Sequence, residues 1–118
     1  MLKERIQTYC QAGENCSRII LQAAAEEYNF PLSEDVLDAC KGISGGFGIG
    51  GLCSGLTAAV MVLGLMFDEE TVKEKRIQFF FLVQEKLGVL DCMRLSSDDC
   101  GEILEIIGEV LKEVIEMK

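Results

Sequence analysis

The six cysteines are the residues best suited to carry chemistry in this chain, because it contains no histidine and no tryptophan. A cysteine thiolate is both a nucleophile and a metal ligand, so grouped thiols favour redox or soft-metal chemistry. The cysteines form three pairs, and each pair brackets a break between two helix-like segments: Cys10 and Cys16, Cys40 and Cys53, Cys92 and Cys100. The spacing predicts a thiol-rich site at these breaks.

The elements that must position these thiols are helices. Apolar residues recur at helical spacing almost throughout, and no run alternates as a strand would. Residues with capping or terminating tendencies mark the boundaries: Asn15, Ser33, Asp68 and Ser96 or Ser97 as N-caps, and Gly13, Pro31 and Gly88 as ends. With 118 residues, 49% of them hydrophobic, we expect a single domain over 1–118. Its predicted fold is an all-α antiparallel bundle of five to six helices.

Two helices are predicted to be central. Residues 42–67 carry no charge, and the helix predicted over Leu52 to Met66 is too short for a bilayer span, which takes about 18 apolar residues. We therefore expect a buried central helix and no membrane span. The helix after Asp68 is apolar on most sides, and it too is predicted to be central: Ile77, Phe79, Phe80, Phe81, Leu82 and Val83.

Antiparallel helices bring the cysteines together. Breaks between successive helices alternate between the two ends of such a bundle, so the three cysteine-bearing breaks share one end. Cys16, Cys53 and Cys100 fall in predicted first turns, where unpaired N–H groups stabilise a thiolate. Cys10 and Cys40 fall in last turns among apolar neighbours, where a role as small buried apolar side chains is an equal alternative.

The glycine-rich segment before Cys53 allows two interpretations. Residues 46–51 match G-x-G-x-x-G, but a dinucleotide site requires a preceding strand, and the preceding residues are predicted to be helical. The segment is either a connector that needs glycine to turn, or a wall of the thiol site whose N–H groups face an anionic group. The second interpretation makes these candidate cofactor-binding residues: Gly46, Gly48, Gly50 and Gly51.

Composition limits the partners and the compartment. The net charge is −9, and the 11 basic residues are dispersed among 20 acidic ones. Nucleic-acid binding needs clustered Lys and Arg, so we expect no nucleic-acid partner. The N-terminal residues are charged and lack the apolar stretch of a signal peptide. We expect a cytoplasmic protein, where accumulated cysteines more often serve metal or redox chemistry than structural disulfides.

Three segments resemble a family of redox-active proteins named for its cysteine string, C_GCAxxG_C_C. They are residues 13–17, the run from 51 to 65 that contains Cys53, and the aromatic helix leading to Gly88 and the last two cysteines. The resemblance covers about residues 10–110. It implies that the family's four characteristic cysteines are Cys16, Cys53, Cys92 and Cys100.

The chain also departs from the family pattern. Where the family tends to have Cys-Gly-Ala-x-x-Gly, this chain has Ser54, Gly55 and Ala58, which stay small. Cys10 and Cys40 are additional to the four. The resemblance implies redox chemistry and no particular substrate.

Three functions are compatible with the sequence. The first is a thiol–disulfide or electron-transfer protein, which as an enzyme would be a thiol-dependent oxidoreductase, and whose partner is a redox protein or a small-molecule oxidant or reductant. The second is a metalloprotein in which Cys16, Cys53, Cys92 and Cys100 hold Zn²⁺ or an iron–sulfur cluster. The third is a helical interaction module, in which the apolar stripe of the last helix serves packing or the seam of a homodimer, and no cysteine reacts. We rank the redox function first.

Overall fold

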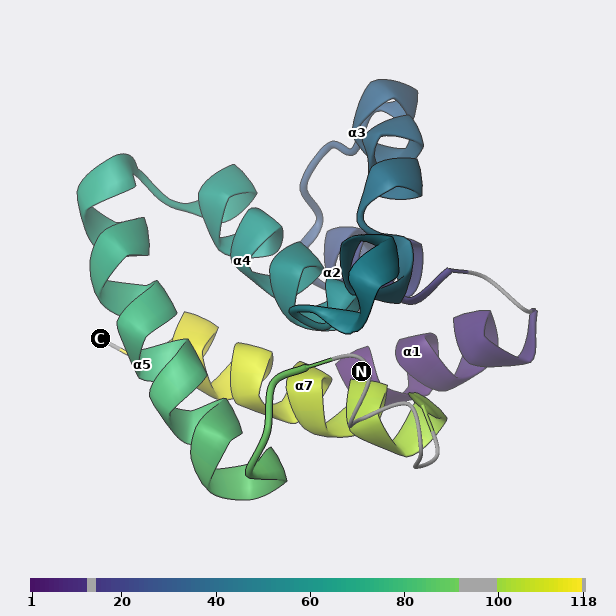
Figure 1. Ribbon diagram of the computed structural model, residues 1–118. Coiled ribbons are helices and arrows are strands. Elements are labelled where there is room, and N and C mark those ends of the chain that lie inside the picture. Colours follow the sequence, from purple (N-terminus) through teal and green to yellow (C-terminus); the bar gives the residue numbers. More distant parts are fainter. Residues whose placement is uncertain (13–14, 92–99, 118) are drawn as a thin grey trace.

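The structure is a computed structural model that describes residues 1–12, 15–91 and 100–117, with the backbone alone for Cys100. The described residues form six α-helices and no strand, which confirms the predicted all-α fold (Figure 1). The helices are α1 (Leu2–Gln11), α2 (Cys16–Tyr28), α3 (Glu34–Ala39), α4 (Ser54–Met66), α5 (Glu69–Leu87) and α7 (Cys100–Glu116). A short 3₁₀ turn, Cys40–Gly42, and a glycine turn, Gly46–Gly50, lie between α3 and α4.

Capping residues set the helix starts as predicted. Three side chains each accept a hydrogen bond from a backbone N–H in the first turn: Asn15 from Ser17 at 2.9 Å, Ser33 from Val36 at 3.3 Å and Asp68 from Thr71 at 2.9 Å. Gly88 ends α5 with a φ of 77°, a conformation that favours glycine. Gly13, Ser96 and Ser97 lie outside the described residues.

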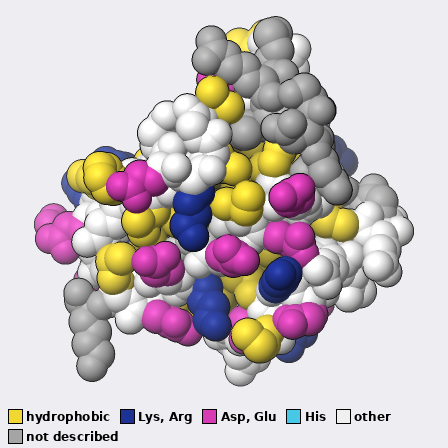
Figure 2. Space-filling model, turned by 90° about the horizontal axis from the view of Figure 1, so that it is seen from below, with side chains coloured by type: hydrophobic (Ala, Val, Ile, Leu, Met, Phe, Trp, Pro, Cys, Tyr) yellow, Lys and Arg dark blue, Asp and Glu magenta, His cyan; other side chains and the backbone are white. Residues whose placement is uncertain are grey.

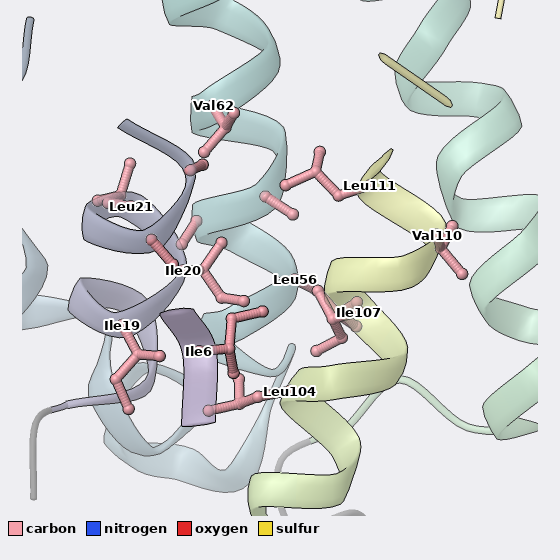
Figure 3. Close-up of a cluster of buried hydrophobic side chains, with 14 of the residues drawn as sticks. Ile6, Ile19, Ile20, Leu21, Leu56, Val62, Leu104, Ile107, Val110 and Leu111 are labelled. Carbon is pink, nitrogen blue, oxygen red and sulfur yellow. The ribbon is translucent and has the colours of Figure 1, made fainter. Parts of the chain in front are cut away.

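Most of the core comes from α1, α2, α4 and α7 (Figure 3), and Leu37 of α3 and Phe79 and Val83 of α5 add to it. Fully buried side chains of these helices interdigitate, among them Ile6, Ile20, Leu56 and Ile107. In α4 the buried residues lie on several sides of the helix: Leu56, Ala58, Ala59, Val62 and Leu63. The prediction of a buried central helix after the glycine segment is therefore confirmed.

Helix α1 runs antiparallel to α7. Ile6 packs on Gly108 so closely that a Cβ added there would lie 2.5 Å from Ile6 Cδ1. The next residue of α1, Gln7, donates a hydrogen bond from its amide to Glu105, which lies about one turn before Gly108 in α7. The C-terminal end of α1 therefore lies beside the N-terminal end of α7.

Helix α5 is also antiparallel to α7, and Lys75 joins the two. The ammonium group of Lys75 donates hydrogen bonds to the carbonyl oxygens of Val114 at 2.8 Å and Met117 at 2.9 Å. The same nitrogen lies 4.9 Å from the centre of the Phe67 ring. Because Phe67 directly follows α4, the cysteine-free break between α4 and α5 lies at the C-terminal end of α7.

The prediction that α5 is central was wrong. Phe79 and Val83 are fully buried, but Ile77 and Phe81 are 68% and 65% exposed. A helix on the surface buries one stripe only, and consecutive apolar residues necessarily point to several sides. Helix α5 therefore covers one side of the core and presents apolar side chains to solvent.

The predicted start of the central helix was two residues early. Leu52 forms an isolated antiparallel bridge with Asp91, and the Cys53 N–H donates to the carbonyl oxygen of Leu90 at 2.9 Å. These backbone groups are extended and paired with another segment, so α4 begins only at Ser54.

The apolar stripe of α7 is not a dimer seam, because this chain covers it. Its apolar residues belong to the core and are at most 6% exposed: Ile103, Leu104, Ile107, Val110, Leu111 and Val114. The surface in Figure 2 instead shows acidic and basic side chains intermixed, with apolar side chains between them. Over the described residues, no helix combines the length and apolar character needed to cross a bilayer.

Candidate functional site

Cys53 lies at the start of α4, where two segments distant in sequence meet. The Cys53 residue is the N-cap of α4 and is 8% exposed. Its N–H is bonded to Leu90, and its neighbour Leu52 is bridged to Asp91. Asp91 directly precedes Cys92 in the sequence. The backbone around Cys53 is thus fixed beside the segment that leads to Cys92.

The sulfur of Cys53 also lies close to α7. A Cβ added to Gly55 would be 3.7 Å from Cys53 Sγ and 2.8 Å from Leu104 Cδ2. Glycine at position 55 is what allows α4 and α7 to approach at this point. The close approach brings the sulfur near the first turns of the helix that begins at Cys100.

Cys10 lies beside the N-terminal end of the same helix. It is half-buried in the last turn of α1 and faces a surface hollow of about 650 Å³. The hollow is lined by Gln7, Cys10, Gln11, Gly101, Glu102 and Glu105. The end of α1 therefore lies beside the start of α7, and the start of α4 packs on the same helix at Leu104.

Cys16 is the first residue of α2 and is half-buried against the core. An ion-pair network joins α1 to α2. The Arg5 guanidinium binds Glu27 at 3.1 Å and Glu26 at 2.9 Å. Its hydrogen bond to Glu27 holds the pKa of that carboxyl below the usual value.

Cys40 is the described cysteine that is wholly removed from solvent, at 0% exposure. Its thiol donates to the carbonyl oxygen of Val36 at 3.5 Å, one helical turn earlier. A buried thiol that bonds its own helix behaves as a small apolar side chain. This environment agrees with the apolar interpretation of Cys40.

The glycine segment forms a compact left-handed turn. Positive φ angles run through Gly45, Gly46, Phe47, Gly48 and Gly50, and they reach 77°. The Gly51 N–H donates to the carbonyl oxygen of Gly46 at 2.9 Å, so the segment folds back on itself. The preceding residues are helical, as predicted, and give no βαβ unit.

The segment also presents two apolar side chains to solvent, Phe47 at 51% and Ile49 at 79% exposure. Phe47 adopts a φ of 64°, which costs a residue with a Cβ on the order of 1 kcal/mol. A role in binding for Gly46, Gly48, Gly50 and Gly51 stays a prediction.

The predicted metal site includes residues that the structure does not describe. Within residues 1–12, 15–91 and 101–117, no three Cys, Asp or Glu side chains are grouped to hold a metal ion. Cys92 and the side chain of Cys100 lie outside these ranges. The set Cys16, Cys53, Cys92 and Cys100 therefore stays a prediction, both for catalysis and for metal binding.

The sequence did not predict that Leu90 and Asp91 hold the backbone at Leu52 and Cys53. A single bridge leaves no alternating pattern that would predict a strand, so no local signal could have found it. The missed hollow at Cys10 is lined by ordinary surface residues of two helices, and their meeting depends on tertiary packing alone.

Comparison with known proteins agrees with the sequence pattern. A family model described as "Putative redox-active protein (C_GCAxxG_C_C)" matches residues 14–114 and confirms the predicted resemblance. The matched range includes Cys16, Cys40, Cys53, Cys92 and Cys100 and leaves out Cys10. Neither a curated protein nor a solved structure matches the chain.

Proposed function

Because the chain belongs to the C_GCAxxG_C_C family, which is described as redox-active, we propose that it acts through thiol–disulfide or electron-transfer chemistry. The reacting residues of this proposal are Cys16, Cys53, Cys92 and Cys100. One observation carries it: the Leu52–Asp91 bridge holds the backbone at Cys53 beside the residue that precedes Cys92. A second thiol within reach is what disulfide exchange requires.

The reaction needs an oxidant with a disulfide bond, either a small molecule or a partner protein. A thiolate of this chain attacks one sulfur of that disulfide, forms a mixed disulfide and releases the first thiolate. A second cysteine of the chain then attacks the mixed disulfide, closes a disulfide within the chain and releases the second thiolate. Two electrons pass to the oxidant, and the two thiol protons go to solvent. The reverse sequence reduces the protein.

Position supports Cys53 as a participant. Its residue caps α4, so the unpaired N–H groups of the first turn lie near the thiol and favour its thiolate form. Cys40 lacks this setting, since it lies at the C-terminal end of α3 and is fully buried. The two residues make a matched pair for experiment.

The test is a count of thiols and disulfides in protein purified without oxygen. Mild oxidation with a small disulfide should remove thiols in pairs, and a reductant should restore them. In Cys53→Ala, we expect oxidation to remove two fewer thiols than in the unmodified protein. In Cys40→Ala, oxidation should remove as many thiols as in the unmodified protein. Mass spectrometry of the oxidised protein identifies the bridge. Thiols that resist oxidation, or equal behaviour of the two variants, would refute the redox function.

A cysteine-ligated metal site is the second candidate, and the helix starts at Cys16 and Cys53 favour it. Thiolates at helix N-termini are good ligands for Zn²⁺ or an iron–sulfur cluster. Four sulfurs at about 2.3 Å from a zinc ion would have to converge. The test is the content of metal and acid-labile sulfide in the oxygen-free preparation. Iron with acid-labile sulfide, or one zinc per chain, would favour this metal site over disulfide exchange.

A further inference from the structure

Helix α5 carries an exposed apolar patch that the redox chemistry does not use. Ile77 and Phe81 are one helical turn apart and are 68% and 65% exposed. They border a shallow hollow of about 350 Å³ that Leu82 and Met117 also line. Large apolar side chains gathered in this way on a surface commonly mark a contact with another molecule.

The charges on the same ridge of α5 point to one kind of partner. Lys73 lies one turn before Ile77, and Glu85 lies one turn after Phe81, and both are exposed. At i, i+4 spacing these four residues form one continuous ridge. Glu69 precedes Lys73 on the same ridge, and its carboxylate lies 3.9 Å from Lys73 Nζ. From Lys73 onwards the ridge is basic, then apolar, then acidic.

The charge pattern from Lys73 to Glu85 is complementary to the same pattern running in the opposite direction. We propose that this ridge binds the same ridge of a second copy of this chain, with the two helices antiparallel. A two-fold axis midway between Ile77 and Phe81 places each Ile77 against Phe81 of the other copy. The same axis places each Lys73 opposite Glu85 of the other copy. One interface thus gains two apolar contacts and two ion pairs.

Other arrangements fit the ridge less well. A parallel pair would set Lys73 against Lys73 and Glu85 against Glu85, which is repulsive. The stripe of α7 is unavailable because it lies in the core. A chain with a net charge of −9 is repelled by anionic lipid, so a membrane surface is disfavoured as the occupant.

The contact is small, and we expect a dissociation constant in the micromolar range. Sedimentation equilibrium of the full chain with a strong reductant measures it, because the reductant removes any disulfide between copies. Phe81→Ala should raise the dissociation constant about tenfold or more, since aromatic side chains at the centre of an interface dominate its affinity.

Charge reversal tests the antiparallel geometry. Lys73→Glu and Glu85→Lys each set like charges against each other twice, and each should raise the dissociation constant about fivefold to tenfold. The double variant, with both changes in every chain, restores two opposite pairs and should return within about threefold of the unmodified protein. Lys41→Glu, on an exposed residue outside α5, is the matched control and should have no effect.

Three results would overturn the inference. They are a monomer at concentrations up to about 0.5 mM, a dimer that is indifferent to Phe81→Ala, or single charge reversals whose effects add in the double variant. Because all these changes are on exposed side chains, in α5 or, for the control, at Lys41, circular dichroism can verify that the variants fold. The thiols take no part, so failure here leaves the redox function untouched.

Discussion

The ammonium group of Lys75 donates a hydrogen bond to the carbonyl oxygen of Val114 at 2.8 Å, across the contact between α5 and α7. Lysine is rarely buried, yet this side chain is among the few buried polar groups of the described residues. The last carbonyl groups of a helix have no partners within it, and a cation there satisfies them and opposes the negative end of the dipole.

Lys75→Met should therefore destabilise the protein by about 2 kcal/mol, because it leaves a buried carbonyl oxygen without its donor. Chemical denaturation measures the loss as a lower midpoint. Lys86→Met, at an exposed position of the same helix, is the control and should change the free energy of unfolding by less than about 0.5 kcal/mol. An equal loss in both variants would show that Lys75 contributes only as a surface residue.

The contact of Gly108 with Ile6 predicts a difference between two glycine substitutions. In Gly108→Ala the new Cβ would be 2.5 Å from Ile6 Cδ1, whereas at Gly64 it would meet nothing within 4 Å. Both glycines are in helices, where alanine is intrinsically better by about 1 kcal/mol. We expect Gly64→Ala to be neutral or stabilising and Gly108→Ala to be about 2 kcal/mol worse, because the core is overpacked.

A second variant tests the cause of that difference. Ile6→Val removes the atom that the new Cβ would meet, so the penalty of Gly108→Ala should largely disappear in this background. A penalty that persists would locate the strain elsewhere along α1.

Solvent exposure predicts the order in which native thiols react. Cys10 and Cys16 are half-buried, whereas Cys40 is wholly buried and bonded to Val36. Alkylation of the native, reduced protein should therefore modify Cys40 last, at a rate set by local unfolding. Peptide mapping over time gives the order, and early modification of Cys40 would contradict this placement.

The surroundings of Tyr28 predict that the free energy of unfolding falls at high pH. Burial, with the negative charges of Glu116 and Glu27 nearby, raises the pKa of Tyr28 to about 12. Between about pH 10 and 12 the unfolded state releases a proton that the folded state keeps, so the free energy of unfolding falls as pH rises through this range. Urea denaturation at several pH values measures the fall.

Tyr28→Phe is the matched control, and its stability should depend less on pH in that range. The Tyr28 hydroxyl finds no hydrogen-bond partner among the described residues, so its removal should cost little at neutral pH. A pH dependence that is unchanged by the substitution would assign the alkaline transition to other groups.

Local chemistry explains what could be predicted from the sequence. Asn15, Ser33 and Asp68 cap their helices as expected, since capping involves a residue and the next two or three along the chain. The family and the all-α fold were also predictable, the first from three segments that resemble the family's motifs and the second from helical periodicity.

Contacts between distant segments explain which features could not be predicted from the sequence. The start of α4 was misplaced because the backbone at Leu52 is held by Asp91, which no pattern near Leu52 reveals. The exposure of Phe81 depends on which stripe of α5 faces the core, and an apolar run on several sides leaves that choice to packing. The arrangement of Cys16, Cys53, Cys92 and Cys100 around one site stays a prediction for the same reason.

The hydrogen bond from the Cys53 N–H to the Leu90 carbonyl oxygen has a consequence for how the chain folds during its synthesis. Its two ends are separated by two whole helices, α4 and α5, and closing so long a loop costs entropy, so such contacts form late in folding. During synthesis Cys53 is made well before Leu90, and we expect its thiol to be most accessible in that interval. Brief alkylation during refolding would follow its protection. The oxidants and reductants that the nascent chain meets, and not only those around the finished protein, therefore act on the Cys53 thiol.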